Sequence, residues 1–308
     1  MADIAGDPAW ADGSEAIKTL ALEHMMSARR FGFEQFFEPL YAVQRINTGL
    51  LDGTGAGLGI FTREILPLVK ALRADDRFAT AAIIRKTSPL LDRDALRDAG
   101  EAQQGLLDRA KGACAGLLAL VDGQPSASLR DVLRYVAEHR LFTVPDVLLP
   151  FATADPDPAD QNDADEDEEE VDNKSETAAW RQALEAPFGQ VDKYDRYVRG
   201  VSQFDTHQGV KGLEFPRVMV VISDEEARGF LFNYDKLFGA KGKSKTDLDN
   251  EAAGKETTID RTRRLFYVTC SRAERSLAIV YYAENPTASR GAMLKQGWFA
   301  EDEVEIID

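Results

Sequence analysis

Apolar residues fall into short continuous runs near both ends of the chain. The clearest run covers residues 218–222, between Pro216 and Asp224, and most of its members are β-branched. Such a run predicts a strand that is buried on both faces of a parallel sheet. Three other runs predict further strands at residues 17–23, 201–206 and 276–282. The pattern indicates an α/β fold in which helices flank a parallel sheet.

The middle of the chain, residues 45–195, has a different pattern, in which apolar residues recur every three or four positions. This spacing predicts amphipathic helices joined by short turns. Ser128 and Asp131 also have the spacing of a helix capping box. We therefore expect two domains: an α/β domain formed by residues 1–44 and 196–308, and an all-helical insertion formed by residues 45–195.

A helix is predicted directly after the first strand, over residues 25–43. Its apolar positions lie on one helical face: Phe33, Phe36, Phe37 and Leu40. The same segment carries Arg29 and Arg30, which have two interpretations. They belong to a solvated helix surface, or they line a phosphate or nucleotide site at the end of the strand.

The formal net charge is −16 at pH 7, but the charge is concentrated in two segments. Residues 155–176 contain twelve acidic residues and one lysine, and residues 301–308 contain five acidic residues and no base. The rest of the chain is close to neutral, so a local basic groove for DNA is compatible with the composition. Because residues 155–176 offer almost nothing to bury, we expect a disordered acidic loop over residues 153–177. Such a loop could compete with DNA for a basic groove.

The composition also bears on compartment and metal binding. Cys114 and Cys270 form neither a disulfide framework nor a metal-ligand pattern, which favours a reducing, cytoplasmic compartment. The start of the chain has no signal-peptide pattern, and no apolar run approaches the roughly 20 residues of a membrane helix. His139 is expected on the surface or at a helix cap, because no potential ligand lies near it at metal-binding spacing. We expect no metal site within this chain.

Two polar segments surround the strand predicted at residues 218–222. Before it, Lys211, Gly212 and Glu214 place a cation, a flexible glycine and a carboxylate within four residues. After it, residues 258–274 predict a helix that carries the densest arginine cluster of the chain: Arg261, Arg263, Arg264 and Arg272. Arg264 and Arg272 are two steps of four apart, so both lie near one face of this helix.

These segments together resemble motifs of a known family. T-H-Q-G-V-K-G-L-E-F, residues 206–215, is followed about forty residues later by D-R-T-R-R-L-F-Y-V-T-C-S-R-A, residues 260–273. They are similar to motifs V and VI of the UvrD/Rep/PcrA family of superfamily 1 DNA helicases. The match spans residues 200–283, and its specificity comes from both motifs occurring in this order. Residues 19–33 resemble the motif IV region more loosely.

The resemblance implies a RecA-like fold, the 2A domain, into which a helical 2B domain is inserted. In this family ATP and Mg²⁺ bind between two RecA-like domains. By resemblance Arg272 is the arginine finger at the γ-phosphate, and Arg264 supports the surface that faces the nucleotide. A permanently charged, bidentate side chain suits this role. Glu214 is expected to accept hydrogen bonds from the nucleotide's sugar. The other positions expected near the nucleotide are Gly212, Arg263, Arg29 and Arg30.

The same resemblance implies contacts with single-stranded or junction DNA. Its DNA-contacting positions are Thr206, His207, Gln208, Gly209 and Lys211, with Thr206 and the amides around Gly209 at a phosphate and Lys211 holding the turn. Two departures put individual roles in doubt. Gln208 stands where the family usually has histidine, and His207 comes one position earlier. Asp260 and Glu256 are both candidates for the acidic partner of the arginines.

No G-x-x-x-x-G-K-[ST] phosphate loop occurs in the sequence, and the glycine-rich stretch 53–59 lacks the lysine, so we interpret it as a turn.

Three functional hypotheses follow. The chain is the C-terminal portion of an ATP-dependent 3′–5′ DNA helicase whose N-terminal P-loop domain holds most of the ATP site. Alternatively, it completes the site of a partner ATPase in trans, or it is a non-catalytic DNA-binding or protein-interaction module. The simplest counter-explanation is that Arg272 and Glu214 form an ion pair that holds the fold. Alone, the chain is expected neither to hydrolyse ATP nor to unwind DNA, and it is not expected to bind a membrane.

Overall fold

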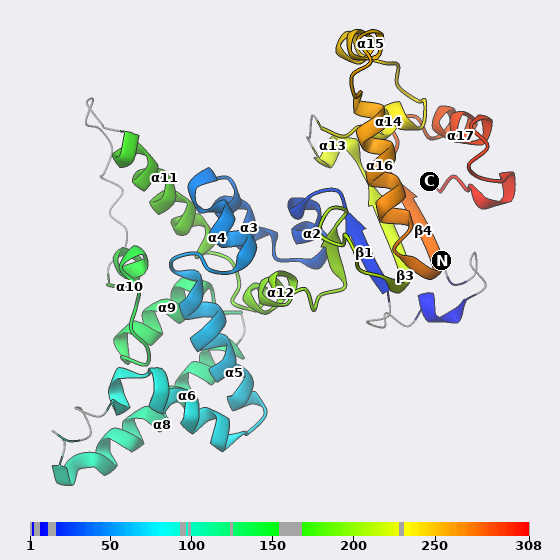
Figure 1. Cartoon of the computed structure of the whole chain (residues 1–308). Coiled ribbons are helices and arrows are strands. Elements are labelled where there is room, and N and C mark those ends of the chain that lie inside the picture. Colours follow the sequence, from blue (N-terminus) through cyan, green and yellow to red (C-terminus); the bar gives the residue numbers. More distant parts are fainter. Residues whose placement is uncertain are drawn as a thin grey trace. The chain divides into compact units, whose positions relative to one another are not determined.

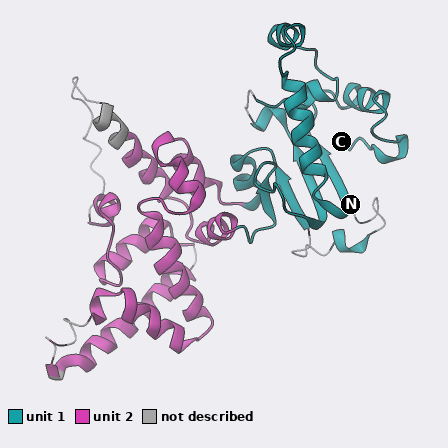
Figure 2. Cartoon of the chain, in the orientation of Figure 1, with its two compact units in different colours: residues 1–31, 200–308 teal, residues 32–199 magenta. Residues whose placement is uncertain are grey.

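The computed structural model describes residues 2, 7–11, 17–92, 97, 100–123, 126–153, 168–227 and 231–307. Within them the chain divides into two compact units. One comprises residues 1–31 and 200–308, and the other comprises residues 32–199 (Figure 2). The first unit holds the sheet, and the second is built from helices (Figure 1).

The sheet has four parallel strands in the order β2-β1-β3-β4. Their bounds are β1 (Ile17–Ala21), β2 (Phe204–Thr206), β3 (Phe215–Ile222) and β4 (Ala273–Tyr281). Two chain segments far apart in sequence therefore meet in the sheet, because β1 lies between β2 and β3. The α/β class with a parallel sheet flanked by helices, which the apolar runs predicted, is confirmed (Figure 1).

The apolar run of β3 forms the centre of the core. Val218, Val220 and Ile222 are fully buried, as is Leu20 of β1. Pro216 lies inside β3 rather than before it, at a register shift against β4 between Phe215 and Arg217. Proline has no N–H to donate to a ladder, so an irregular position is where a strand tolerates it.

Helices surround this sheet: α2 (His24–Phe31), α13 (Asp224–Ala227), α14 (Tyr234–Leu237), α15 (Lys245–Ala252), α16 (Thr258–Cys270) and α17 (Pro286–Lys295). Figure 1 shows α16 lying along β3 and β4. Short 3₁₀ turns flank these elements at Pro8–Trp10 and Glu301–Glu303. The predicted helix at 258–274 is thus present, and it begins with a capping box between Thr257 and Asp260.

The helical unit contains α3 (Glu34–Tyr41), α4 (Asn47–Asp52), α5 (Leu66–Arg73), α6 (Arg77–Thr87), α8 (Gln103–Val121), α9 (Leu129–Glu138), α10 (Leu149–Thr153), α11 (Glu168–Ala183) and α12 (Gly189–Val198). A π-helical turn at Ile60–Ile65 precedes α5, and 3₁₀ turns lie at Gln44–Ile46, Pro89–Leu91, Gly100–Ala102 and Asp146–Leu148. The predicted capping box of Ser128 and Asp131 starts α9, and His139 caps its end. Gly53 takes φ +73 after α4, in agreement with a turn.

Three predictions need correction. The helix expected over 25–43 is broken into α2 and α3, because Gly32 adopts φ +79, which ends a helix. The units consequently divide after residue 31 instead of 44, and Phe36 of α3 packs on Tyr194 of α12 within the helical unit. Of the acidic loop expected at 153–177, residues 154–167 lie outside the described part of the chain, and the remainder from Glu168 belongs to α11.

Candidate functional site

Arg272 joins the two motif-bearing segments at one edge of the sheet. Its Nη1 donates to the carbonyl oxygen of Leu213 at 2.9 Å, its Nε to the carbonyl oxygen of Val268 at 2.8 Å, and its Nη2 to Ser271 Oγ at 2.9 Å. The backbone N–H of Phe215 in turn donates to the Arg272 carbonyl oxygen at 2.8 Å. Residues that precede the parallel strands β3 and β4 are thereby fixed against each other. A guanidinium has five N–H donors, so two of the five remain after these three bonds.

Glu214 lies directly beside this arrangement, one residue before β3. Its side chain is exposed, and within the described part of the chain no ion pair joins it to Arg272. The ion-pair explanation for these two residues is therefore wrong: Arg272 is held by carbonyl oxygens and a hydroxyl. Gly212 is exposed and has φ +85, a conformation that glycine adopts without steric cost. The carboxylate of Glu214 is left facing solvent.

The other arginines of α16 are engaged by both acidic candidates. Arg264 Nη2 forms an ion pair with Glu256, which also lies 3.8 Å from Arg261 Nη1. Arg263 Nη1 lies 3.4 Å from Asp260 Oδ1. The side chains of Arg263 and Arg264 are mostly exposed, so these pairs are screened by water and exchange readily.

The positions predicted to contact DNA divide into buried and exposed members. Thr206 is buried, and its Oγ1 accepts a hydrogen bond from the N–H of Gly209 at 3.0 Å. His207 is fully buried, with Nδ1 3.1 Å from the hydroxyl of Tyr234 and Nε2 3.2 Å from the carbonyl oxygen of Leu20. Gln208, Gly209 and Lys211 are exposed. The buried pair shapes the turn, and the exposed residues form its surface.

A close backbone approach explains the glycine at position 209. A Cβ there would collide with the carboxylate of Asp205. That carboxylate accepts the N–H of Thr206 at 2.8 Å and lies 3.3 Å from Lys18 Nζ. The sequence alone pointed to this glycine as a phosphate contact, and the structure adds a steric reason for it.

Arg29 and Arg30 lie on α2, where the carboxyl ends of the strands emerge. Arg30 forms a bidentate pair with Glu226, with both N–O distances 2.8 Å, and its guanidinium lies 5.6 Å from the ring centroid of Tyr282. The hydrogen bond from Arg30 keeps the pKa of the Glu226 carboxyl below its usual range. Arg30 therefore ties α2 to α13, whereas Arg29 is half-buried on the same helix.

The two cysteines do not supply a nucleophile. Burial raises the pKa of Cys114 to about 11 and that of Cys270 to about 12, so both stay protonated at neutral pH. In the described residues, no group of three or more His, Cys, Asp or Glu side chains could hold a metal ion. No helix within the same residues has the length and apolar character needed to cross a membrane.

No protein-family model matches the chain, and the comparison with curated proteins gives no match. The geometry around Arg272 and the residue pattern are thus the evidence on function. The sequence analysis did not identify Asp247, whose carboxylate is buried. The spacing of Ser244 and Asp247, which is that of a helix capping box, could have indicated it.

Proposed function

We propose that this chain is the C-terminal portion of an ATP-dependent DNA helicase of the UvrD/Rep/PcrA kind, with 3′–5′ polarity. Its sheet unit, residues 1–31 and 200–308, then corresponds to the RecA-like 2A domain, and its helical unit, residues 32–199, corresponds to a 2B-like insertion. A P-loop domain, in the same polypeptide or in a partner ATPase, supplies most of the site for ATP and Mg²⁺. Two free cysteines suit a cytoplasmic setting.

The observation that carries this proposal is the orientation of Arg272. Three hydrogen bonds hold the guanidinium at the junction of the motif V turn and α16, and two N–H groups remain for a ligand. A fixed cation that retains free donors fits a γ-phosphate presented from an opposing domain. ATP with Mg²⁺ supplies the phosphoryl chemistry when it is bound. This chain contributes the positive charge of Arg272, which its hydrogen bonds hold in position before ATP binds.

The neighbouring residues take supporting roles in this proposal. The exposed carboxylate of Glu214, carried on the turn at Gly212, accepts hydrogen bonds from the nucleotide's sugar. Arg264 adds positive charge along α16. Arg29 and Arg30 lie where the carboxyl ends of the strands emerge, at the opposite ends of the strands from Arg272, so they are left out of this nucleotide site. Single-stranded or junction DNA is contacted by Gln208, Gly209 and Lys211, on a turn that the buried Thr206 and His207 hold in shape. One connection between β2 and β3 thus links the DNA surface to the nucleotide surface.

An alternative function is favoured by the same bonds. Because Arg272 anchors Leu213, its role can be to stabilise the turn of a non-catalytic DNA-binding or protein-interaction module. The two functions differ in what loss of the side chain does. If Arg272 is structural, its removal lowers the stability of the fold. If Arg272 is an arginine finger, its removal lowers the rate of ATP hydrolysis in a protein that stays folded.

The test uses the chain together with its P-loop domain and measures DNA-stimulated ATP hydrolysis. Arg272→Ala is expected to reduce kcat about 10³-fold, as loss of an arginine finger does. Arg272→Lys is also expected to be impaired, because lysine cannot make the orienting bonds. Arg275→Ala removes an exposed arginine of β4 and serves as the matched control. A folded Arg272→Ala variant with full activity would eliminate the finger assignment and favour the module.

A further inference from the structure

One face of α16 forms the wall of an apolar groove. Arg263, Phe266, Tyr267 and Cys270 are spaced so that they share this face. Leu277 and Ile279 of β4 lie opposite, and Trp298 and Phe299 close the end. The groove has a volume of about 280 Å³.

Aromatic rings dominate this groove and remain open to solvent. Phe266 and Trp298 are stacked, with ring centroids 6.2 Å apart and an interplanar angle of 19°. Tyr267 is 74% exposed and Trp298 is 42% exposed. Open aromatic faces beside an apolar slot are suited to a flat ring that stacks on them. The slot therefore favours a planar, largely apolar ligand group.

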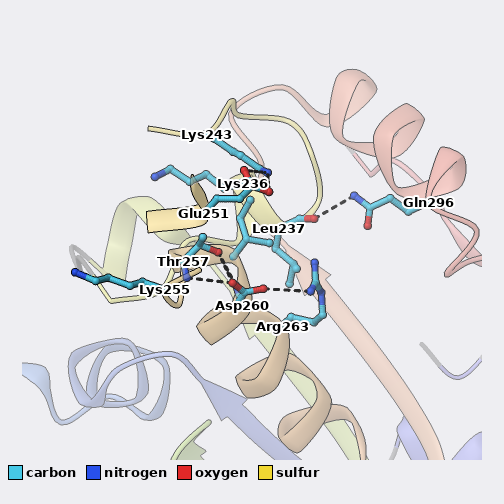
Figure 3. Close-up of a pocket in the computed structure, with 10 residues that line it drawn as sticks. Lys236, Leu237, Lys243, Glu251, Lys255, Thr257, Asp260, Arg263 and Gln296 are labelled. Carbon is cyan, nitrogen blue, oxygen red and sulfur yellow. Dashed lines mark hydrogen bonds and ion pairs between the residues drawn. The ribbon is translucent and has the colours of Figure 1, made fainter. Parts of the chain in front are cut away.

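Arg263 lines both this groove and a polar pocket. Figure 3 shows the residues that line the polar pocket. This second pocket has a volume of about 480 Å³, and its cationic residues are Lys236, Lys243, Lys255 and Arg263. Arg263 and Lys243 are paired with Asp260 and Glu251, but these pairs are substantially exposed and hence weak. A phosphate group, which binds a guanidinium bidentately, can displace the carboxylate of Asp260 from Arg263.

One wall of the polar pocket is held rigidly. The buried Asp247 carboxylate lies 2.6 Å from Lys236 Nζ and accepts the N–H of Thr258 at 3.1 Å. These bonds tie α14 to the start of α16, which carries Arg263. The start of the helix that carries Arg263 is therefore held in place by these bonds.

We propose that these adjoining pockets bind one nucleotide unit, with its base in the aromatic groove and its phosphate at Arg263 and Lys243. The site differs from the one around Arg272, because Arg263 lies within α16, two residues after Arg261, whereas Arg272 lies beyond the C-terminal end of that helix. It does not rest on the proposed helicase function, since it requires binding and no hydrolysis. The shared ligand chemistry is a nucleoside phosphate, either free or within a single strand.

The experiment titrates the full chain with dAMP, deoxyadenosine and deoxyribose 5-phosphate by calorimetry. We expect dAMP to bind at least tenfold more tightly than either fragment, because only dAMP occupies both pockets. Tyr267→Ala should weaken dAMP about tenfold, as loss of one base stack does. Arg263→Gln should weaken dAMP by a similar factor and leave deoxyadenosine unchanged, because only the phosphate contact is lost.

Controls come from exposed residues elsewhere. Phe78→Ala removes an aromatic ring that is 91% exposed on α6, and Lys245→Gln removes an exposed cation of α15 that does not line the pocket. A (dA)₁₀ oligonucleotide distinguishes the sources: tighter binding than dAMP indicates a strand, and equal binding indicates a free nucleotide. The inference is overturned if dAMP shows no binding at 10 mM, or if Tyr267→Ala has no larger effect than Phe78→Ala.

Discussion

His207 shows how burial assigns a role that the sequence alone left open. It occupies the turn between β2 and β3, yet its ring is enclosed between Tyr234 and the backbone of β1. Desolvation lowers its pKa from 6.5 to about 4. The ring is therefore neutral at physiological pH, and it supports the turn from inside instead of offering a charge to a phosphate.

This pKa predicts a pH dependence of stability. Since the pKa is lower in the folded than in the unfolded state, the unfolded chain binds more protons between about pH 4 and 6.5, and stability falls as the pH decreases through that window. Between pH 7 and 5 the contribution lost is about 2 kcal/mol. Urea unfolding of the wild type and of His207→Gln measures it, and the variant should lose correspondingly less.

The ring can also be titrated directly by NMR. A midpoint near 4 is expected for His207, whereas a midpoint near 6.5 would show that the imidazole reaches solvent and would return it to the candidates for DNA contact.

The hydrogen-bond partners of Arg272 could not be predicted from the sequence. The resemblance singles out Arg272 as the proposed finger and assigns it to the same site as Glu214. It could not predict that three of its N–H groups are used within the chain, because the carbonyl of Leu213 comes from a segment 59 residues away. The orientation of a side chain depends on such non-local partners, and residue type and spacing do not contain them.

At the scale of elements, Asp247 connects three helices. It is buried on α15, pairs with Lys236 of α14 at 2.6 Å, and accepts the N–H of Thr258 at the start of α16. Burial alone would raise the pKa of its carboxyl, but the bonds from Lys236, Ser244 and Thr258 outweigh this effect and hold the pKa well below its usual range. The charged carboxylate is thus part of the fold.

Asp247→Asn is expected to destabilise the protein by about 3 kcal/mol at pH 7, because it leaves the ammonium of Lys236 buried without its counter-charge. In the wild type this contribution is present above the unfolded-state pKa of about 3.9 and is lost as the pH falls below it. Urea unfolding provides the measurement. Asp249→Asn, on the exposed face of the same helix, should change stability by less than about 0.5 kcal/mol. Equal effects of the two substitutions would show that Asp247 is not a connecting residue.

The elements themselves were predictable where a strong apolar pattern specifies them. β3 and β4 follow from continuous runs, and α16 follows from its spacing. α15 was not predicted, because residues 240–256 are polar and show no apolar periodicity, although Ser244 and Asp247 form a capping box. The break at Gly32 was missed because helix-forming segments lie directly on both sides of it. Short polar helices depend on caps and on one buried contact, which periodicity does not detect.

For the whole molecule, the two units explain why separated segments build one sheet. β1 and β2 pair directly, with Leu20 opposite Asp205, although the helical unit is inserted between these two strands in the sequence. The division into units was expected from the change in pattern. Its position was not, since the apolar face of α3 is equally compatible with either unit until its partner on α12 is known.

The distribution of charge over the chain leads to the last prediction. Nearly all of the net charge of −16 resides in residues 155–176 and 301–308, so the surface that carries Gln208 and Lys211 belongs to a nearly neutral body. An acidic segment in the same molecule lowers the local attraction for nucleic acid and can occupy a basic groove in its place.

Replacing residues 155–167 by a Gly/Ser linker leaves α11 intact. We expect this replacement to tighten binding of a single-stranded oligonucleotide roughly three- to tenfold at low salt, with a smaller gain at high salt because the effect is electrostatic. A scrambled segment that keeps all its acidic residues should bind like the wild type. If the linker variant binds no more tightly than the scrambled one, the acidic segment does not compete with DNA.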